Sequence, residues 1–418
     1  MNLYNTLSQK LEPFQPEDKT VRLYVCGITP YDTTHLGHAF TYTMFDILVR
    51  FLEYRGWYIS YLQNVTDIDD DILRKAKQES EDWRSLGNRW TRHFIQDMQA
   101  LNVRPPDFYV RATSAIPDIV VSVGKLLETG VAYENGGSVY YHIDSWPDYG
   151  RLSHLSKAEM LPIANERGNT PDDPKKRDPL DFVLWQAQAP GEPAWDSPWG
   201  PGRPGWHIEC STLITRYLGE NIEVHSGGSD LIFPHHESEI AQIEPVAQRK
   251  PFVRCWMHVA MVRHEGEKMS KSLGNLVMVR DLLRSWSPDT LRLYLAGHHY
   301  RQAWSHSETE LETAALQAEK MAAALNAEGG SGHSLEIDDF ENEFIQALEA
   351  DLDTPAALQV MHRMAGEILA SAGHGQDITA AQACLRRFGQ VFGLRLDAGQ
   401  AEPRVIAGWE KHAQQFEG

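Results

Sequence analysis

The chain has 418 residues, 42% of them hydrophobic and 10% aromatic, and can therefore bury a large core in two or three domains. A formal net charge of −19 argues against broad electrostatic attachment to nucleic acid, because such binding depends on lysine and arginine. The sequence shows neither an apolar run of membrane-spanning length nor a basic segment followed by an apolar one at its start, and its four cysteines are too scattered for a disulfide framework. We therefore expect a cytoplasmic protein with no membrane partner.

The first predicted element is a strand over residues 21–25, which ends in a loop that contains Cys26. A helical pattern follows, and a strand, loop and helix in this order form a phosphate-binding junction in parallel α/β sheets. His35 and His38 share one face of the first helical turn, and Gly37 between them leaves room for a flat ring against the backbone. The pattern predicts a nucleotide site, although histidines that cap a helix and a glycine that relieves packing would produce it equally well.

Strands and helices alternate through the next part of the chain. A second strand over 57–62 ends in polar residues that face the same cleft, where Asn64 and Thr66 can bond a substrate and Asp69–Asp71 can cap a helix. Further elements are expected as helices over 83–101 and 116–127 and as a hairpin over 132–142 that turns at Asn135-Gly136-Gly137.

Proline, glycine and charged residues dominate between 144 and 205, which indicates an insertion between the two halves of a nucleotide-binding fold. The second half continues with a strand over 222–225. Helices over 280–284 and 288–300 come next, and a glycine-rich gap at 328–332 separates them from a helical region over 340–394. The predicted fold class is α/β, with a parallel sheet, an insertion and a C-terminal helical bundle.

Two lysines stand three apart in the loop Glu267–Asn275. The ammonium groups of Lys268 and Lys271, with small hydroxyl neighbours, suit the β and γ phosphates of a nucleotide triphosphate. Such a run alone is usually a solvated turn. Together with His35 and His38 it forms a highly specific pair of motifs.

These two stretches resemble the HIGH and KMSKS signatures of class I aminoacyl-tRNA synthetases. Their surroundings resemble the cysteine branch, which contains the cysteinyl-tRNA synthetases and the mycothiol-pathway cysteine ligases, from about Leu3 to about Leu394. The resemblance implies a Rossmann-type catalytic domain. It divides the chain into a catalytic domain over 1–275 with an insertion at about 107–204, a connecting stem-contact region over 276–327, and a C-terminal helical domain over 334–418 without a recognisable anticodon-binding module.

Cys26, Cys210, His235 and Glu239 are the candidate metal ligands, and the last two stand at i and i+4. Their scattered spacing alone favours a packing role. The resemblance implies instead that they hold one zinc ion, which takes the substrate's thiolate as a further ligand and so separates cysteine from serine. Other cysteines and histidines lack partners at ligand spacing and are assigned to packing or the surface, namely Cys255, Cys384, His225, His298 and His299.

The resemblance also implies that cysteine reacts with ATP and its Mg²⁺ to give cysteinyl-adenylate. His35, His38, Lys268 and Lys271 would then be the catalytic residues. Trp206 would form a wall of the amino-acid pocket, whereas Asp230 either pairs with a substrate or only caps its own turn. The residues implied around the adenylate are Cys26, Gly27, Ile28, Thr29, Thr41, Asn64, Val65, Thr66, Trp206, Gly228, Ser229, Asp230 and Val262.

Three features favour an amino sugar, glucosaminyl-inositol, as the acceptor of cysteine. The first loop reads Cys-Gly-Ile-Thr-Pro, Glu166–Pro171 resembles a mycothiol-type stretch, and the chain from Leu335 to Gly418 is short and acidic. Glu239 points the other way, because mycothiol enzymes generally lack that carboxylate, so tRNA(Cys) is the principal alternative. A third reading is a non-catalytic adenylate-binding or zinc-binding relative, against which the intact histidine and lysine pairs count. The oligomeric state is open, with a monomer favoured.

Overall fold

The computed structural model describes residues 1–16, 18–31, 34–269, 274–396 and 401–417. Lys271 lies outside the described residues, and so does the side chain of Lys268. The lysine half of the predicted phosphate site therefore stays a prediction.

A five-stranded parallel sheet forms the centre of the molecule, in the order β11-β10-β3-β4-β5. Its central strand alternates between two hydrophobic cores: Leu23 and Val25 belong to one, and Tyr24 and Cys26 to the other. This period of two is expected for a strand buried on both faces. The strands are β3 (Thr20–Ile28), β4 (Tyr58–Val65), β5 (Phe108–Arg111), β10 (Ile222–Gly228) and β11 (Val253–Val259).

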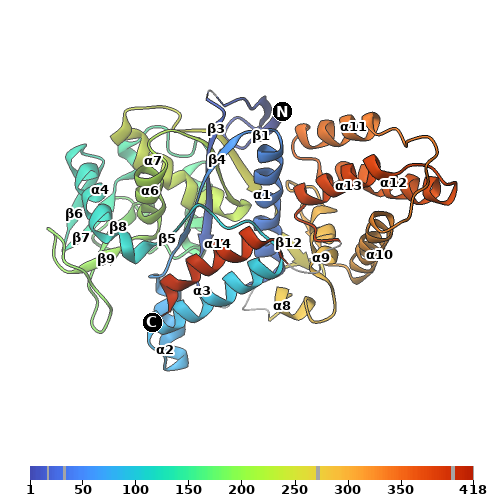
Figure 1. The fold of residues 1–418 in the computed structure, drawn as a ribbon. Coiled ribbons are helices and arrows are strands. Elements are labelled where there is room, and N and C mark those ends of the chain that lie inside the picture. The colour runs from blue at the N-terminus through green and yellow to red at the C-terminus, as the bar shows by residue number, and fades with distance from the viewer. Residues whose placement is uncertain (17, 32–33, 270–273, 397–400, 418) are drawn as a thin grey trace.

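Helices cover both faces of this sheet, so the predicted α/β class is confirmed (Figure 1). Buried residues of α1 and α9 share the core that contains Leu23, whereas those of α4, α6 and α7 share the core that contains Tyr24. The helices are α1 (Leu36–Tyr54), α2 (Asp70–Glu79), α3 (Trp83–Ala100), α4 (Ile116–Glu128), α6 (Trp206–Tyr217), α7 (Glu237–Ala247), α8 (Val279–Leu282) and α9 (Pro288–Ala296).

A second, antiparallel sheet of order β6-β7-β8-β9 lies between β5 and α6 along the chain. The hairpin predicted at Asn135-Gly136-Gly137 joins its first two strands. The elements of this part are β6 (Ala132–Asn135), β7 (Ser138–Tyr141), α5 (Lys157–Glu166), β8 (Phe182–Ala187) and β9 (Gly202–Pro204). Because β5 belongs to the central sheet, the second sheet occupies only part of the insertion expected over 107–204.

Two differences from the expected boundaries affect the site. His235 and Glu239 do not share a regular helix: α7, which carries Glu239, begins at Glu237, and His235 lies in a wide turn over Ile232–His236, where Phe233 has extended backbone angles (φ −138°, ψ 135°). The short helix expected over 280–284 is α8, which begins at Val279 and ends at Leu282.

A helical bundle follows the catalytic fold, formed by α10 (Glu308–Leu325), α11 (Asp338–Glu349), α12 (Thr354–Gly373) and α13 (Thr379–Val391). The last helix, α14 (Pro403–Ala413), leaves this bundle and lies along α3 (Figure 1). Short strands complete the fold as β1 (Asn2–Asn5), β2 (Lys10–Pro13), β12 (Val262–His264), β13 (Glu267–Lys268) and β14 (Trp304–Ser305).

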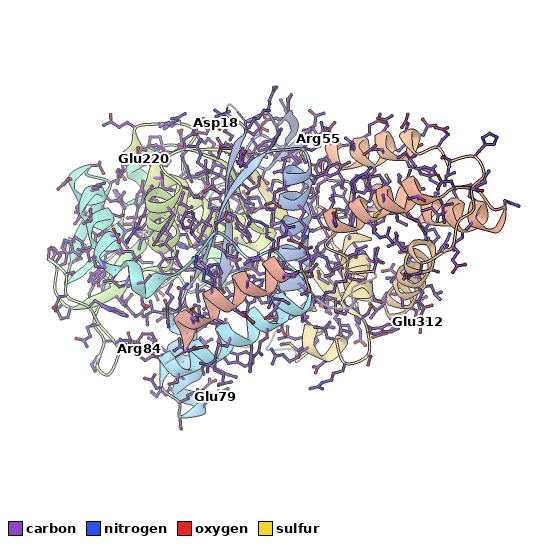
Figure 2. The ribbon with its side chains drawn as sticks, viewed as in Figure 1. Asp18, Arg55, Glu79, Arg84, Glu220 and Glu312 are labelled. Carbon is purple, nitrogen blue, oxygen red and sulfur yellow. The ribbon has the colours of Figure 1, made fainter. Side chains whose placement is uncertain are left out.

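Side chains fill the space between these elements, and the charged residues that Figure 2 labels lie at the periphery. None of the described helices is both long and apolar enough to cross a membrane.

Candidate functional site

A β-bulge at the end of β3 positions the first candidate ligand, Cys26. Val25 pairs with Gln63 and Ile28 with Val65, so two residues of β3 lie opposite Asn64. The Gly27 N–H donates to Asn64 Oδ1 at 2.7 Å, and a Cβ on Gly27 would lie 1.6 Å from the Asn64 carbonyl oxygen. Only glycine fits at this approach, and the bulge directs Cys26 into the second core.

The structure brings the four predicted metal ligands together. Cys26 Sγ lies 3.9 Å from Cys210 Sγ, and His235 Nε2 lies 3.2 Å from Cys210 Sγ. One ligand atom from each of Cys26, Cys210, His235 and Glu239 lies within 4.8 Å of the other three. An ion with bonds of about 2.0–2.3 Å would hold its ligands at about such separations.

The chemistry of this donor set fits a divalent cation. Burial raises the pKa of the Cys210 thiol and of the Glu239 carboxyl well above their usual ranges, and it lowers that of His235. Glu239 Oε1 lies 3.1 Å from His235 Nε2, but the geometry is not that of a hydrogen bond. This oxygen atom has no hydrogen-bond partner among the described residues. A shared cation would satisfy these facing acceptors and favour the deprotonated thiols.

Histidines that the sequence did not indicate as functional support these ligands. His207 Nδ1 lies 2.8 Å from His235 Nδ1, which leaves the Nε2 atom of His235 for the cluster. His225 Nε2 lies 2.8 Å from Glu239 Oε2, so this buried histidine, which the sequence assigned to packing or the surface, also contacts a candidate ligand. Such contacts orient metal ligands. No spacing signal could have revealed them, because the rings come from α6 and β10.

A cavity of about 830 Å³ opens above Cys26 and extends to the start of α1. Asn64, Val65 and Ser229 do not line it, and Asn64 acts behind the wall through Gly27. The implied substrate-binding residues that do line it are Cys26, Gly27, Ile28, Thr29, Thr41, Thr66, Trp206, Gly228, Asp230 and Val262.

The two motif histidines meet at the N-terminus of α1. His35 caps the helix, its Nδ1 accepting from the Gly37 N–H at 3.1 Å, and its ring centre lies 3.9 Å from that of His38. A Cβ on Gly37 would approach the His35 ring to 3.0 Å. His35 therefore does cap the helix, as the alternative to a nucleotide site required. Both rings also line the cavity, however, where the N-terminus of the helix favours an anion.

The segment after the KMSKS loop runs against the start of this helix. The Leu36 N–H donates to the Val277 carbonyl at 2.8 Å, and the Val279 N–H donates to the Thr34 carbonyl at 3.1 Å. Inside the loop, between Lys268 and Lys271, Met269 is buried and lines the cavity. Met269 and the backbone that follows the loop thus lie beside the start of α1.

The insertion forms the opposite wall of the cavity. Its residues Arg167, Lys176 and Arg203 line the space, and Arg167 Nη1 lies 3.3 Å from Asp230 Oδ2. Asp69 also lines the cavity, in the segment between β4 and α2. The sequence indicated neither Arg167 nor Asp69 as an individual site residue, because a single charged residue between helices and strands carries no periodic pattern.

A family model described as tRNA synthetases class I (C) catalytic domain matches residues 13–363, which is most of the chain. The chain belongs to the class I (C) tRNA synthetases. A second model, described as DALR domain, matches residues 343–397 in the C-terminal bundle of this synthetase-family chain.

Relatives of this class I chain act on cysteine by name. A cysteine--tRNA ligase of Dehalococcoides mccartyi is 43% identical over 412 residues, which cover 97% of this chain and 88% of the relative. An L-cysteine:1D-myo-inositol 2-amino-2-deoxy-alpha-D-glucopyranoside ligase of Thermomonospora curvata is 44% identical over 383 residues and covers 91% of each chain. The class I chain is therefore an enzyme, a cysteine ligase.

The same fold occurs in a methionyl-tRNA synthetase of Mycobacterium tuberculosis solved in complex with methionyl-adenylate. This structure matches with a TM-score of 0.64 at 15% identity, over 95% of this chain and 93% of the other. The match confirms the predicted class I synthetase fold.

Proposed function

We propose that this enzyme activates L-cysteine with ATP, as cysteinyl-adenylate, and transfers the cysteinyl group to tRNA(Cys). The observation that carries the proposal is a cavity lined both by Cys26, a member of the four-residue cluster, and by His35 and His38 at the start of α1. One end suits a thiol and the other a phosphate chain. Cysteine bound by its sulfur would present its carboxylate towards the nucleotide end.

Zinc is the ion we propose for the cluster, because two thiols, an imidazole and a carboxylate are the donors it prefers. Bound zinc supplies a soft Lewis-acid position for the substrate's sulfur. The shape of a pocket alone separates isosteres such as cysteine and serine by only about 10- to 200-fold. Trp206 stacks on His235 with ring centres 4.3 Å apart and would close the amino-acid pocket.

In the first step, a carboxylate oxygen of cysteine attacks the α-phosphorus of ATP, and the bond to the β-phosphate bridging oxygen breaks. His35, His38 and the N-terminus of α1 would stabilise the charge that develops there, with Lys268 and Lys271 on the β and γ phosphates and Mg²⁺ accompanying ATP. The acceptor then attacks the acyl carbon, AMP leaves, and the acceptor's proton passes to solvent.

The acceptor assignment to tRNA(Cys) rests on Glu239 and on the relatives. Glu239 completes the buried cluster, and this carboxylate is the feature that mycothiol-type enzymes generally lack. Cysteine--tRNA ligases of Dehalococcoides mccartyi, Thermococcus onnurineus and Shewanella loihica match the chain at 41–43% identity. We therefore rank tRNA(Cys) before the amino sugar, which the sequence alone favoured.

The amino sugar remains a second candidate, for one structural reason. Residues of the mycothiol-like stretch, Glu166 to Thr170, line the cavity itself, where a small polyhydroxylated amine would meet them. The Thermomonospora ligase also covers 91% of both chains. Attack by a sugar amine would give an amide, and attack by a ribose hydroxyl would give an ester.

A paired assay tests the proposal. Cysteine-dependent exchange of pyrophosphate into ATP measures activation, and radioactive cysteine offered with tRNA(Cys) or glucosaminyl-inositol identifies the acceptor. We expect exchange and charged tRNA. An amide with the sugar and no charged tRNA would establish the second candidate, and absence of exchange in zinc-loaded enzyme would favour the non-catalytic reading. A cytoplasmic location and a monomeric state remain predictions.

A further inference from the structure

The end of the described chain packs against α3 of the catalytic domain, far along the sequence from any motif. The turn Gln414–Phe416 follows α14, and both contact α3 (Figure 1). Trp409 is 1% exposed and donates its Nε1–H to the Val103 carbonyl at 2.8 Å, and Phe416 is also 1% exposed. We call residues 409–416 the C-terminal clasp.

The clasp holds one arginine at the end of β5. Arg111 Nη1 donates to the Gln415 carbonyl at 2.9 Å, and its guanidinium carbon lies 4.7 Å from the ring centre of Phe416. On its other side, Arg111 Nε donates to Asp67 Oδ2 at 2.8 Å and Nη2 to Asn88 Oδ1 at 2.6 Å. The planar fork of arginine thus connects the clasp to Asp67 in one fixed orientation.

Asp67 is a buried carboxylate that fixes the loop after β4. It is 3% exposed, and besides Arg111 it accepts from the Thr113 N–H at 2.9 Å and the Thr113 hydroxyl at 2.6 Å. A buried carboxylate that loses its cationic partner costs several kcal/mol or moves. The position of Asp67 therefore depends on Arg111.

The loop that Asp67 fixes is part of the cavity wall. Thr66 lines the cavity, and its N–H donates to the Ile28 carbonyl at 3.0 Å. Asn64 Nδ2 donates to the Thr66 hydroxyl at 3.0 Å, while Asn64 Oδ1 accepts from the Gly27 N–H. A continuous series of contacts thus leads from Phe416 to the residue beside Cys26.

We propose that the C-terminal clasp positions the substrate-binding wall of the cavity, with Phe416 and Arg111 as positioning residues for cysteine activation. Phe416 and the Gln415 carbonyl restrict the guanidinium to the rotamer that binds Asp67, and Asp67 in turn holds Thr66 and the bulge at Gly27. The expected effect on substrate KM values rests on the proposed activation of cysteine. The structural part of the inference, that the clasp holds residues 66–69 in place, does not depend on it.

The test compares truncations of two buried apolar side chains near the end of the described chain, one inside the clasp and one outside it. Phe416→Ala removes the ring that holds Arg111, and Val405→Ala removes a fully buried side chain of α14 as a matched control for stability. In pyrophosphate exchange we expect Phe416→Ala to raise KM for cysteine and ATP by about 5- to 20-fold at a nearly unchanged kcat per active site, and Val405→Ala to leave both KM values unchanged. Equal KM values in the two variants would overturn the inference.

Coupling through Asp67 is tested by combining Phe416→Ala with Asp67→Asn. If the clasp acts through this carboxylate, the double variant is no worse than Asp67→Asn alone, whereas additive effects on KM would contradict the route. Should Phe416→Ala fail to fold, Phe416→Leu keeps the burial and removes the stacked ring.

Hydrogen exchange provides a readout that needs no activity. We expect the backbone amides of residues 66–69 to exchange faster in the Phe416 variant than in Val405→Ala. Unchanged protection would overturn the structural part of the inference even if the enzyme activates cysteine, and absence of exchange activity in the unaltered enzyme would count against the proposed function alone.

Discussion

His207 and His235 meet through their Nδ1 atoms, 2.8 Å apart; His207 lines the cavity, and His235 is fully buried. Burial lowers the pKa of both rings, so both are neutral and only one of the facing nitrogens carries a proton. When His235 binds a cation through Nε2, its Nδ1 is the donor and His207 is the acceptor. His207 therefore selects the tautomer of His235 that can act as a ligand.

Replacing His207 by phenylalanine should weaken metal binding while the fold persists. Phenylalanine keeps an aromatic ring beside Phe182, whose ring centre lies 5.4 Å away, but offers no acceptor to His235. We expect zinc affinity to fall by about 10- to 100-fold, measured by competition with a chromogenic chelator. His154→Phe, an exposed ring, is the control. Equal affinities in the two variants would show that the Nδ1 contact does not orient the ligand.

Cys210→Ala should remove both the bound metal and the activation of cysteine. Cys210 is fully buried and contacts Cys26 and His235, so the substitution removes the thiol that adjoins two other candidate ligands. We expect pyrophosphate exchange to fall by more than about 100-fold, the upper effect of losing a supporting residue alone. Cys384→Ala removes an equally buried thiol in α13 and should retain zinc. A metal-free Cys210→Ala enzyme with normal exchange would refute the role of the thiolate.

Gly27→Ala should disrupt the site at the bulge. The added Cβ would lie 1.6 Å from the Asn64 carbonyl oxygen, so the two backbones must separate and the contact of the Gly27 N–H with Asn64 must break. We expect loss of cysteine binding and a lower melting temperature. Gly124→Ala on α4 meets nothing within 4 Å and should instead stabilise the protein by about 0.5–1 kcal/mol. Similar thermal shifts in the two variants would contradict the close approach.

Asp69→Asn should change how stability depends on pH. Burial raises the pKa of Asp69 from 3.8 to about 6, so the folded state holds this proton more tightly than the unfolded state. That contribution to stability is fully present below pH 3.8 and is lost as the pH rises through 6. Asparagine keeps an oxygen to cap the Asp71 N–H, which now bonds Asp69 Oδ1 at 2.7 Å.

The Asp69→Asn enzyme should therefore be more stable than the parent at neutral pH, by up to about 3 kcal/mol, and lose this advantage towards pH 4. Urea unfolding at several pH values measures the difference. The exposed Asp172→Asn makes the same charge change as a control. An Asp69→Asn advantage that is constant with pH would exclude titration of this carboxyl as the cause.

The sequence predicted the parts of the fold that follow from periodicity. The apolar run before Cys26 is β3, the pattern after it is α1, and the turn at Gly136 is a hairpin, because each depends on neighbours in the chain. The four cluster residues were also identified, although their spacing favoured packing and only the resemblance to a family suggested a metal.

What the sequence could not predict depends on contacts between distant segments. The bulge at Gly27 exists because β4 approaches at Asn64, and His207 gains its role only where α6 faces the turn that carries His235. The return of Phe416 to Arg111 joins residues that no local pattern connects. Tertiary packing alone determines these positions.

Different parts of the chain line the region of the cavity proposed to select the amino acid and the region proposed to select its acceptor. The cluster around Cys210 belongs to the central fold, whereas Arg167 and Lys176 belong to the insertion on the opposite wall. Under the proposed function, a lineage of such enzymes can change the molecule that receives cysteine by altering loop residues, while the choice of amino acid is inherited unaltered. Exchanging the insertion segment that carries Arg167 and Lys176 between relatives is therefore the change we expect to alter the acceptor while cysteine remains the amino acid.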